Sequence, residues 1–295
     1  MHVSIALFYI VTLPTFASIV DLKRDAPTLR REPNTDDSRF PYRHDSEWGA
    51  IFLTHSHPDF LERAMKSFFS LAGAESFDVT VSLDNPGAVE QTIPVIKRMQ
   101  AKFPYLINRV RLAIFPSPSS HDGETRVTNH VLLALSLLFQ GSNKYGLFLE
   151  DDLIFSPDFL EFMMKGADVI EKDESLFCVS AWNGVPGTNP RKFNRMDYFP
   201  GLGWLTTKSR LQEMFMEGGV MKRPTFKNWD WWFTTELKNT GKGCIYPEVP
   251  RSHHFGHGGV HVSMDDFSYD KLPFADIPAG VGTFRHVLDG LTKPN

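Results

Sequence analysis

The sequence predicts an α/β fold in which a mostly parallel sheet is covered by helices on both faces. Strand-like apolar runs alternate with helix-like stretches throughout the first half of the chain, which is typical of strands joined by helical crossovers. The chain has 295 residues, of which 42% are hydrophobic and 13% aromatic, so it can also bury a full core. The length suits one large α/β domain or two small ones.

The first strand is expected at residues 50–53, a short continuous apolar run. The alternation then continues with helices at 59–71, 89–103 and 125–139 and strands at 77–83, 110–115 and 146–149. A further helix should follow with Pro157 in its first turn and Ser156 as its N-cap. Beyond Lys172 the regular pattern gives way to Gly, Pro and aromatic residues, so we expect loops built over a ligand crevice.

An acidic triplet, Glu150-Asp151-Asp152, directly follows one of the expected strands. Three adjacent carboxylates repel one another unless a cation binds between them. Mg²⁺ and Mn²⁺ take one or two protein carboxylates and complete their coordination with water and phosphate oxygens. The triplet therefore predicts a divalent-cation site for a nucleotide-linked substrate, and the alternative is a solvated acidic turn.

A second carboxylate, Asp84, follows the expected strand at 77–83. Ligands of parallel α/β sheets bind beyond the carboxyl ends of the strands, near the point where the strand order reverses. We therefore expect Asp84 and the acidic triplet to line one crevice.

Charge and the N-terminal stretch limit the class of protein. The net charge of −4 and the scattered Lys and Arg residues exclude a basic surface for nucleic acid. The apolar stretch 3–20 predicts a secretory signal peptide, with an uncleaved membrane anchor as the alternative. The expected organisation is a signal or anchor at residues 1–20, a disordered stem or linker at 21–47, a catalytic domain at 48–270 and a tail at 271–295.

The two cysteines, Cys178 and Cys244, can form one disulfide in an oxidising compartment. The alternative is that both are small buried apolar residues.

Two histidine groups allow other chemistry. His55, His57 and Asp59 resemble the opening of a zinc-hydrolase motif, but Phe60 stands where the next ligand is needed. A Gly-rich stretch contains a second group, in which imidazoles can donate hydrogen bonds to an anion or, alternatively, bind zinc: His253, His254, His257 and His261.

Several blocks taken together resemble the N-acetylglucosaminyltransferase I family, which includes protein O-mannose β-1,2-N-acetylglucosaminyltransferase. The resemblance covers about residues 49–262. It is carried by residues 149–159, 176–183, 199–204, Trp229-Asp230, and 244–252 with Phe255-Gly256.

The resemblance implies a GT-A type fold and a Mn²⁺-dependent, inverting transfer of N-acetylglucosamine from UDP-N-acetylglucosamine to a mannose-type acceptor on a glycoprotein. It assigns the metal to Asp152 and the general base to Asp230. It also implies a disulfide between Cys178 and Cys244. The donor contacts that it implies are Asp84, His130, Glu150, Asp151, His57, Trp229, Val260 and His261.

Some of these positions depart from the family pattern. Ser56-His57 stands where Asp-Arg or Asn-Arg is expected, and His261 replaces a serine. A catalytically silent sugar-binding relative is therefore the main alternative, ahead of a zinc hydrolase. The implied location is the secretory pathway, either membrane-anchored in the Golgi lumen or secreted.

Overall fold

The structure is a computed structural model of the 295-residue chain. It describes residues 18–20, 46–115, 122–218, 220–222, 224–225, 227–256 and 272–279. Most of the expected leader, stem and tail lies outside these residues.

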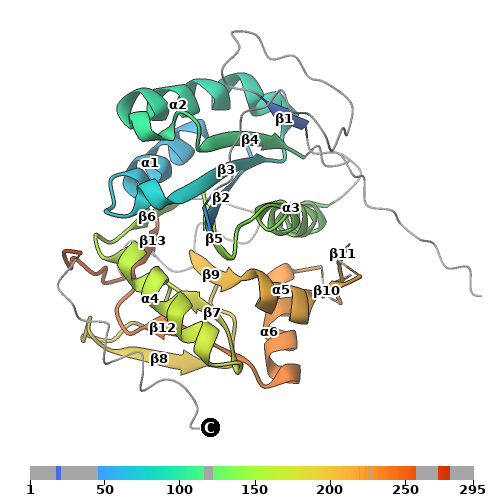
Figure 1. The fold of residues 1–295 in the computed structure, drawn as a ribbon, viewed down its shortest axis with the longest axis vertical. Helices are drawn as coiled ribbons and strands as arrows, with labels where there is room; N and C mark the ends of the chain where they lie inside the picture. The colour runs from blue at the N-terminus through green and yellow to red at the C-terminus, as the bar shows by residue number, and fades with distance from the viewer. Residues whose placement is uncertain are drawn as a thin grey trace, which may run out of the picture.

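A nine-stranded sheet runs through the described part of the chain (Figure 1). Its strand order is β1-β4-β3-β2-β5-β9-β7-β12-β8. In chain order the strands are β1 (Ser18–Val20), β2 (Trp48–Thr54), β3 (Phe77–Leu83), β4 (Val110–Ile114), β5 (Tyr145–Glu150), β7 (Leu176–Ser180), β8 (Phe193–Met196), β9 (Trp204–Thr207) and β12 (Gly243–Pro247).

Most of these strands run in one direction. The strands β4, β3, β2 and β5 are parallel neighbours, and β12 is parallel to β7. β9 is antiparallel to both β5 and β7, which therefore point the same way. β1 and β8 form antiparallel edges. The predicted mostly parallel sheet is confirmed.

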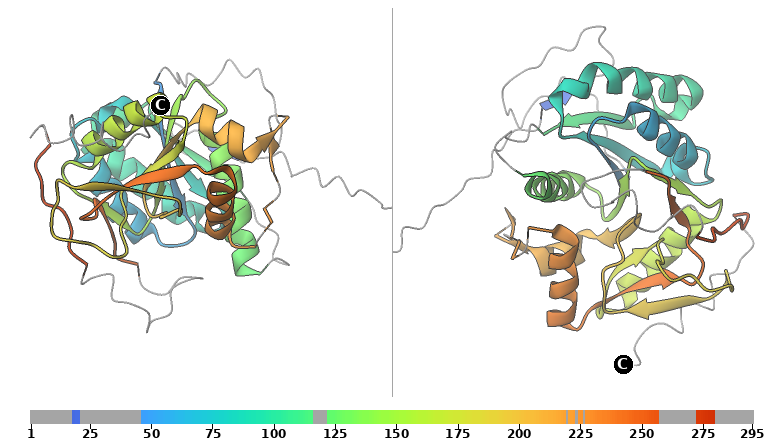
Figure 2. Two further views of the ribbon diagram at one scale, coloured as in Figure 1. Left: turned by 90° about the horizontal axis from the view of Figure 1, so that it is seen from below. Right: turned by 180° about the vertical axis from the view of Figure 1, so that it is seen from behind.

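Helices cover both faces because successive side chains of each strand point to opposite sides. Ala50 and Phe52 of β2 pack with one group of helices, whereas Ile51 packs with another. The first group is α1 (Pro58–Phe69), α2 (Val89–Lys102) and α4 (Phe159–Lys172). The second group, seen on the opposite side of the sheet in Figures 1 and 2, is α3 (Gly123–Leu138), α5 (Lys208–Phe215) and α6 (Trp229–Thr240).

Short elements complete the fold. The strands β6 (Leu153–Phe155) and β13 (Ser252–His254) form a separate antiparallel pair, as do β10 (Met216–Glu217) and β11 (Val220–Met221). Three short 3₁₀ helices lie at Ala74–Ser76, Pro86–Ala88 and Pro104–Leu106.

The expectation of loops beyond Lys172 is wrong, because β7, β9 and β12 extend the central sheet. These strands have only four or five residues, and their partners are distant in sequence. Pairing between distant segments stabilises them, and no local periodicity reveals it.

The helix after the acidic triplet also begins later than expected. It starts at Phe159, and Ser156 donates a hydrogen bond of 2.6 Å to Asp158 instead of capping the helix. The Asp158 carboxylate accepts hydrogen bonds from the fully buried Arg251, at 3.3 Å from Nε and 3.2 Å from Nη2. This buried ion pair holds residues 156–158 outside the helix.

Other boundary findings concern the N-terminal part. Glu47, at the end of the expected linker, accepts backbone hydrogen bonds from Lys144 and Tyr145 and so belongs with the sheet. Ser18–Val20, at the end of the expected leader, pairs with β4. Among the described helices, none has the length and apolar character needed to cross a membrane. The signal or anchor remains a prediction.

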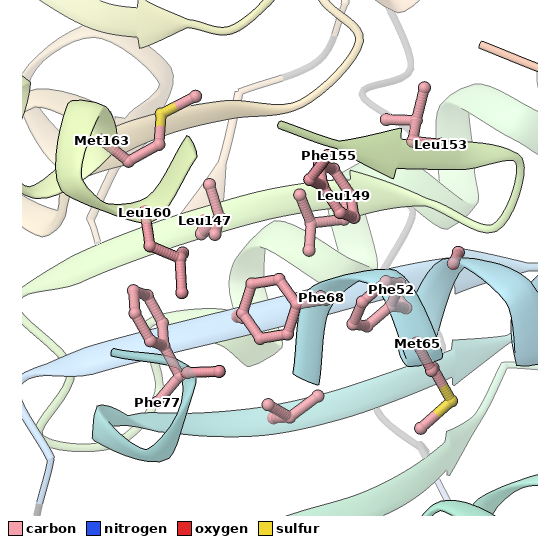
Figure 3. Close-up of a cluster of buried hydrophobic side chains, with 14 of the residues drawn as sticks. Phe52, Met65, Phe68, Phe77, Leu147, Leu149, Leu153, Phe155, Leu160 and Met163 are labelled. Carbon is pink, nitrogen blue, oxygen red and sulfur yellow. The ribbon is translucent and has the colours of Figure 1, made fainter. Parts of the chain in front are cut away.

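An aromatic cluster beneath α1 stabilises the β2, β3 and β5 region (Figure 3). Phe68 is fully buried at its centre. Its ring meets Phe52, Phe77 and Phe155 edge-to-face at 5.6, 5.7 and 6.1 Å between centroids. Edge-to-face pairs contribute stability beyond the apolar area that they bury.

We predict that Phe68→Ala lowers the free energy of unfolding by about 3–5 kcal/mol, because it removes the ring and leaves a cavity. Urea denaturation measures the loss. The control is Lys66→Ala, an exposed position on the same helix, expected to change stability by less than about 0.5 kcal/mol. A loss below about 1 kcal/mol for Phe68→Ala would contradict this packing.

Candidate functional site

The acidic triplet lies at the carboxyl end of β5, where it forms the turn into β6. In the sheet register, Leu53 of β2 is paired with Glu150, so the ends of the two strands are level. Thr54, the last residue of β2, donates a hydrogen bond of 2.6 Å to Oδ2 of Asp151. The turn is thereby attached to the neighbouring strand.

Asp152 is held by the end of β13 and the residue that follows it. Its Oδ2 lies 2.9 Å from Nε2 of His254, and its backbone oxygen accepts a 2.9 Å hydrogen bond from the Phe255 amide. Its Oδ1 is buried and has no hydrogen-bond partner among the described residues. A buried carboxylate oxygen without a donor is an atom that a cation can satisfy.

Burial and mutual repulsion raise the pKa values of the neighbouring acids. Burial is the main cause for Glu150, whose pKa rises to about 8; Asp152, Asp151 and Asp230 add to the rise and His254 opposes it. Burial followed by Asp152 raises the pKa of Asp151 to about 7, against the hydrogen bond from Thr54. The site therefore favours added positive charge.

His254 shows the opposite response to the same charges. Burial alone disfavours its imidazolium form. The hydrogen bond with Asp152 and the charges of Glu150 and Asp151 outweigh burial, so the pKa of His254 is raised.

Asp84 forms a second polar group at the level ends of β2 and β3. Its Oδ1 lies 2.6 Å from Nδ1 of His55, and its Oδ2 lies 3.9 Å from Nδ1 of His130 on α3. Nε2 of His130 lies 2.7 Å from the Ser82 hydroxyl. The predicted donor residues Asp84 and His130 are thus brought together.

His130 is kept neutral in this group. Burial lowers its pKa to about 4, His55 contributes to the shift, and Asp84 and Ser82 oppose it. A neutral imidazole can both donate and accept a hydrogen bond.

Asp230 lies in the first turn of α6, and its Oδ1 accepts a 2.7 Å hydrogen bond from the Trp231 amide. Because its charge helps to raise the pKa of Glu150, Asp230 lies within electrostatic reach of the acidic turn. The next side chain, Trp231, is 60% exposed.

Two of the remaining predicted donor residues, His57 and Trp229, are described by the structure, and both contact aromatic rings. The Trp229 ring is buried against Phe148, Phe199 and Phe233, and its contact with the donor stays a prediction. The His57 ring is exposed and stacks on Phe60 at 5.0 Å. Val260 and His261 lie outside the described residues.

The histidine hypotheses also need revision. His253 and His254 do not belong to a Gly-rich loop, because they lie in β13, paired with β6. His55 contacts Asp84 rather than His57. Within the residues described by the structure, no group of three or more His, Cys, Asp or Glu side chains forms a metal cage, so these residues supply no ready-made zinc site.

The sequence analysis gave other roles to two neighbours of the site, His55 and His254. The signal for His55 is the parallel pairing of β2 with β3, which places the residue after Thr54 beside Asp84. The signal for His254 is not local, because its contact with Asp152 requires the antiparallel β6–β13 pair.

The two cysteines pair across parallel neighbours of the sheet. Cys178 of β7 and Cys244 of β12 are register partners, with Cα atoms 4.6 Å apart, and their sulfurs are joined in a buried disulfide.

Comparison with known proteins gives the family. A model described as the GNT-I family matches residues 38–277. The chain belongs to the GNT-I family. The resemblance drawn from the sequence blocks is therefore confirmed, and membership of the GNT-I family supports the GT-A designation of the fold.

This GNT-I family member is also similar to a curated enzyme and to solved structures of glycosyltransferases. Alpha-1,3-mannosyl-glycoprotein 2-beta-N-acetylglucosaminyltransferase of Arabidopsis thaliana is 26% identical over 226 residues, 72% of this chain and 48% of that protein. The chain thus spans about half the length of this relative. Among solved structures, S. aureus TarS has a TM-score of 0.46 at 13% identity, covering 68% of this chain and 58% of that chain. The mannosyltransferase PcManGT of Pyrobaculum calidifontis, in complex with GDP-Man and Mn²⁺, has a TM-score of 0.45 at 13% identity, covering 70% and 57%.

The lowered pKa of His130 predicts a pH-dependent stability. Between pH 6.5 and about 4 the unfolded chain binds a proton at this residue and the folded chain does not, so stability is lost as the pH falls. Compared with the His130→Gln variant, which has no imidazole at this position, the wild type should lose about 2 kcal/mol of its free energy of unfolding between pH 7 and 4.5.

Urea unfolding of both proteins at each pH measures this difference. All other residues are the same in both proteins, so the difference reports on His130. A stability difference that does not change with pH would contradict a buried neutral His130.

The disulfide predicts that the denatured, non-reduced protein has no thiol that reacts with iodoacetamide. After reduction, two thiols per chain should react, as counted by intact-mass spectrometry. The Cys178→Ser, Cys244→Ser double variant should be less stable by up to about 4 kcal/mol, since the bond closes a long loop in the unfolded chain. Two reactive thiols before reduction would show that the bond is absent.

Proposed function

We propose that this GNT-I family member is an inverting glycosyltransferase. In this proposal it transfers N-acetylglucosamine from UDP-N-acetylglucosamine to a mannose-type acceptor on a glycoprotein, with Mn²⁺ as the divalent cation and Asp230 as the general base. The observation that carries the proposal is the Oδ1 of Asp152, which is buried without a hydrogen-bond donor among the described residues, in the turn after β5 where family resemblance assigns the metal.

The residues around Asp152 fit a divalent cation. Its Oδ1 is buried and accepts no hydrogen bond from the described residues, and an oxygen ligand suits Mn²⁺ or Mg²⁺. Asp152 would hold the ion, with water and donor phosphates as further ligands. A bound Mn²⁺ would neutralise charge on the departing diphosphate.

Asp230 is suited to act on the incoming hydroxyl. Its Oδ1 is held by the Trp231 amide, which orients the carboxylate so that Oδ2 can accept the proton of an acceptor hydroxyl. Attack from the side opposite the leaving group then inverts the anomeric carbon. The exposed Trp231 ring beside this carboxylate offers an apolar face of the kind that contacts sugar rings.

The donor's nucleoside is assigned to the group formed by Asp84 and His130. The Asp84 carboxylate accepts hydrogen bonds, and the neutral His130 imidazole, held by Ser82, donates or accepts one. Glu150 and Asp151 are assigned to the sugar and ribose hydroxyls, for which their carboxyl oxygens are suitable acceptors.

The proposed location is the secretory pathway, either anchored in the Golgi membrane through residues 3–20 or secreted. An oxidising lumen is compatible with the buried Cys178–Cys244 bond.

The test uses two isosteric variants. Asp230→Asn should lower turnover of UDP-N-acetylglucosamine with a mannose-terminated acceptor about 10²- to 10⁴-fold and retain Mn²⁺-dependent UDP binding, because it removes only the base. Asp152→Asn should abolish the Mn²⁺ dependence of UDP binding. A UDP-release assay and calorimetric titration with UDP measure the two effects.

The matched control is Asp59→Asn, an exposed carboxylate in the first turn of α1 that should change neither quantity. Full activity of Asp230→Asn would remove the proposed base. Tight UDP-sugar binding with no turnover on any mannose-terminated acceptor would instead favour a silent sugar-binding relative. Loss of activity in Asp59→Asn as well would show that the effects of the other two variants are not specific to the acidic turn and Asp230.

A further inference from the structure

Three successive residues, His254, Phe255 and Gly256, close around Asp152. Nε2 of His254 lies 2.9 Å from Oδ2, and the Phe255 amide donates to the backbone oxygen of Asp152 at 2.9 Å. At Gly256 an added Cβ would lie 2.3 Å from Oδ2 and 2.9 Å from the Asp152 Cβ. This segment therefore approaches Asp152 at its backbone oxygen, its Cβ and its Oδ2.

The two carboxylate oxygens of Asp152 have different surroundings. Oδ2 has His254 as its partner, whereas Oδ1 is buried with no hydrogen-bond donor among the described residues. A hydrogen bond to one oxygen prevents the carboxylate from rotating, so the other oxygen keeps a constant direction. Such contacts beyond the first coordination sphere typically control metal affinity about 10- to 100-fold.

His254 is held in place by its burial and by the pairing of its strand. Its side chain is buried, and its strand β13 pairs in register with β6, with His254 opposite Leu153, the residue after Asp152. The imidazole thus reaches Asp152 from a paired strand and not from a loop.

We infer that His254 is a positioning residue for the cation site: it binds Oδ2 of Asp152 and directs Oδ1 toward the ion, and Gly256 permits the close approach that this requires. The inference rests on the proposed function, since it takes Asp152 as the protein ligand of the cation.

The test measures binding of Mn²⁺ in the presence of UDP by the electron paramagnetic resonance signal of free Mn²⁺, so that it does not depend on turnover. His254→Leu should weaken Mn²⁺ binding about 10- to 100-fold, because the carboxylate is no longer held. His254→Gln should restore binding to within about threefold, since its amide nitrogen can donate to the same oxygen. Gly256→Ala should weaken binding without altering any donor.

The matched control is His253→Leu. His253 is the neighbouring histidine on β13, and its ring lies 5.9 Å from that of Phe274, so its side chain points to the other side of the strand. This variant should bind Mn²⁺ like the wild type. Melting temperatures measured in EDTA identify any variant that fails to fold. If His254→Leu fails to fold, Gly256→Ala tests the inference without a change at His254.

The outcomes separate the inference from the proposed function. If Asp152→Asn binds Mn²⁺ as tightly as the wild type, the proposed cation site is wrong and the inference falls with it. If Asp152→Asn loses binding but His254→Leu and Gly256→Ala do not, only the inference is overturned. Failure of His254→Gln to restore binding, with nitrogen coupling in the bound Mn²⁺ spectrum of the wild type, would make His254 a ligand and overturn its positioning role.

Discussion

The structure depends on the crowding of acidic groups at the carboxyl end of β5. Glu150, Asp151, Asp152 and Asp230 lie close enough for their charges to interact, in surroundings that disfavour ionised carboxyls. Among the described residues, His254 opposes this charge. Such an arrangement is costly for folding and is therefore most easily explained by a positively charged ligand that binds there.

The sheet makes this arrangement possible because its strand ends are level. The pairing of β2 with both β3 and β5 places Thr54 beside Asp151 and His55 beside Asp84. On one face, the aromatic cluster around Phe68 supports these strands. On the other, Trp229, the first residue of α6, packs against Phe148 of β5, and Asp230 follows it in the first turn of that helix.

The sequence was sufficient for features that depend on local pattern. The strands and α-helices from β2 to β5 were predicted because buried strands and amphipathic helices have clear periodicities, and Asp84 and the acidic triplet were found because they end strands. β7, β9 and β12 were missed because they are stabilised by distant partners. The contact of His254 with Asp152 could not be predicted for the same reason, since it requires the pairing of β13 with β6.

The central claim is that a divalent cation binds at Asp152 in the site that also contains Asp230. The most direct measurement is a crystal structure with Mn²⁺ and UDP, with the ion located by its anomalous scattering. The account predicts one strong peak at coordinating distance from Oδ1 of Asp152, with the UDP phosphates between it and Asp230. A peak beside His55 and His57, or UDP bound in a site that contains no metal and does not adjoin Asp230, would contradict it.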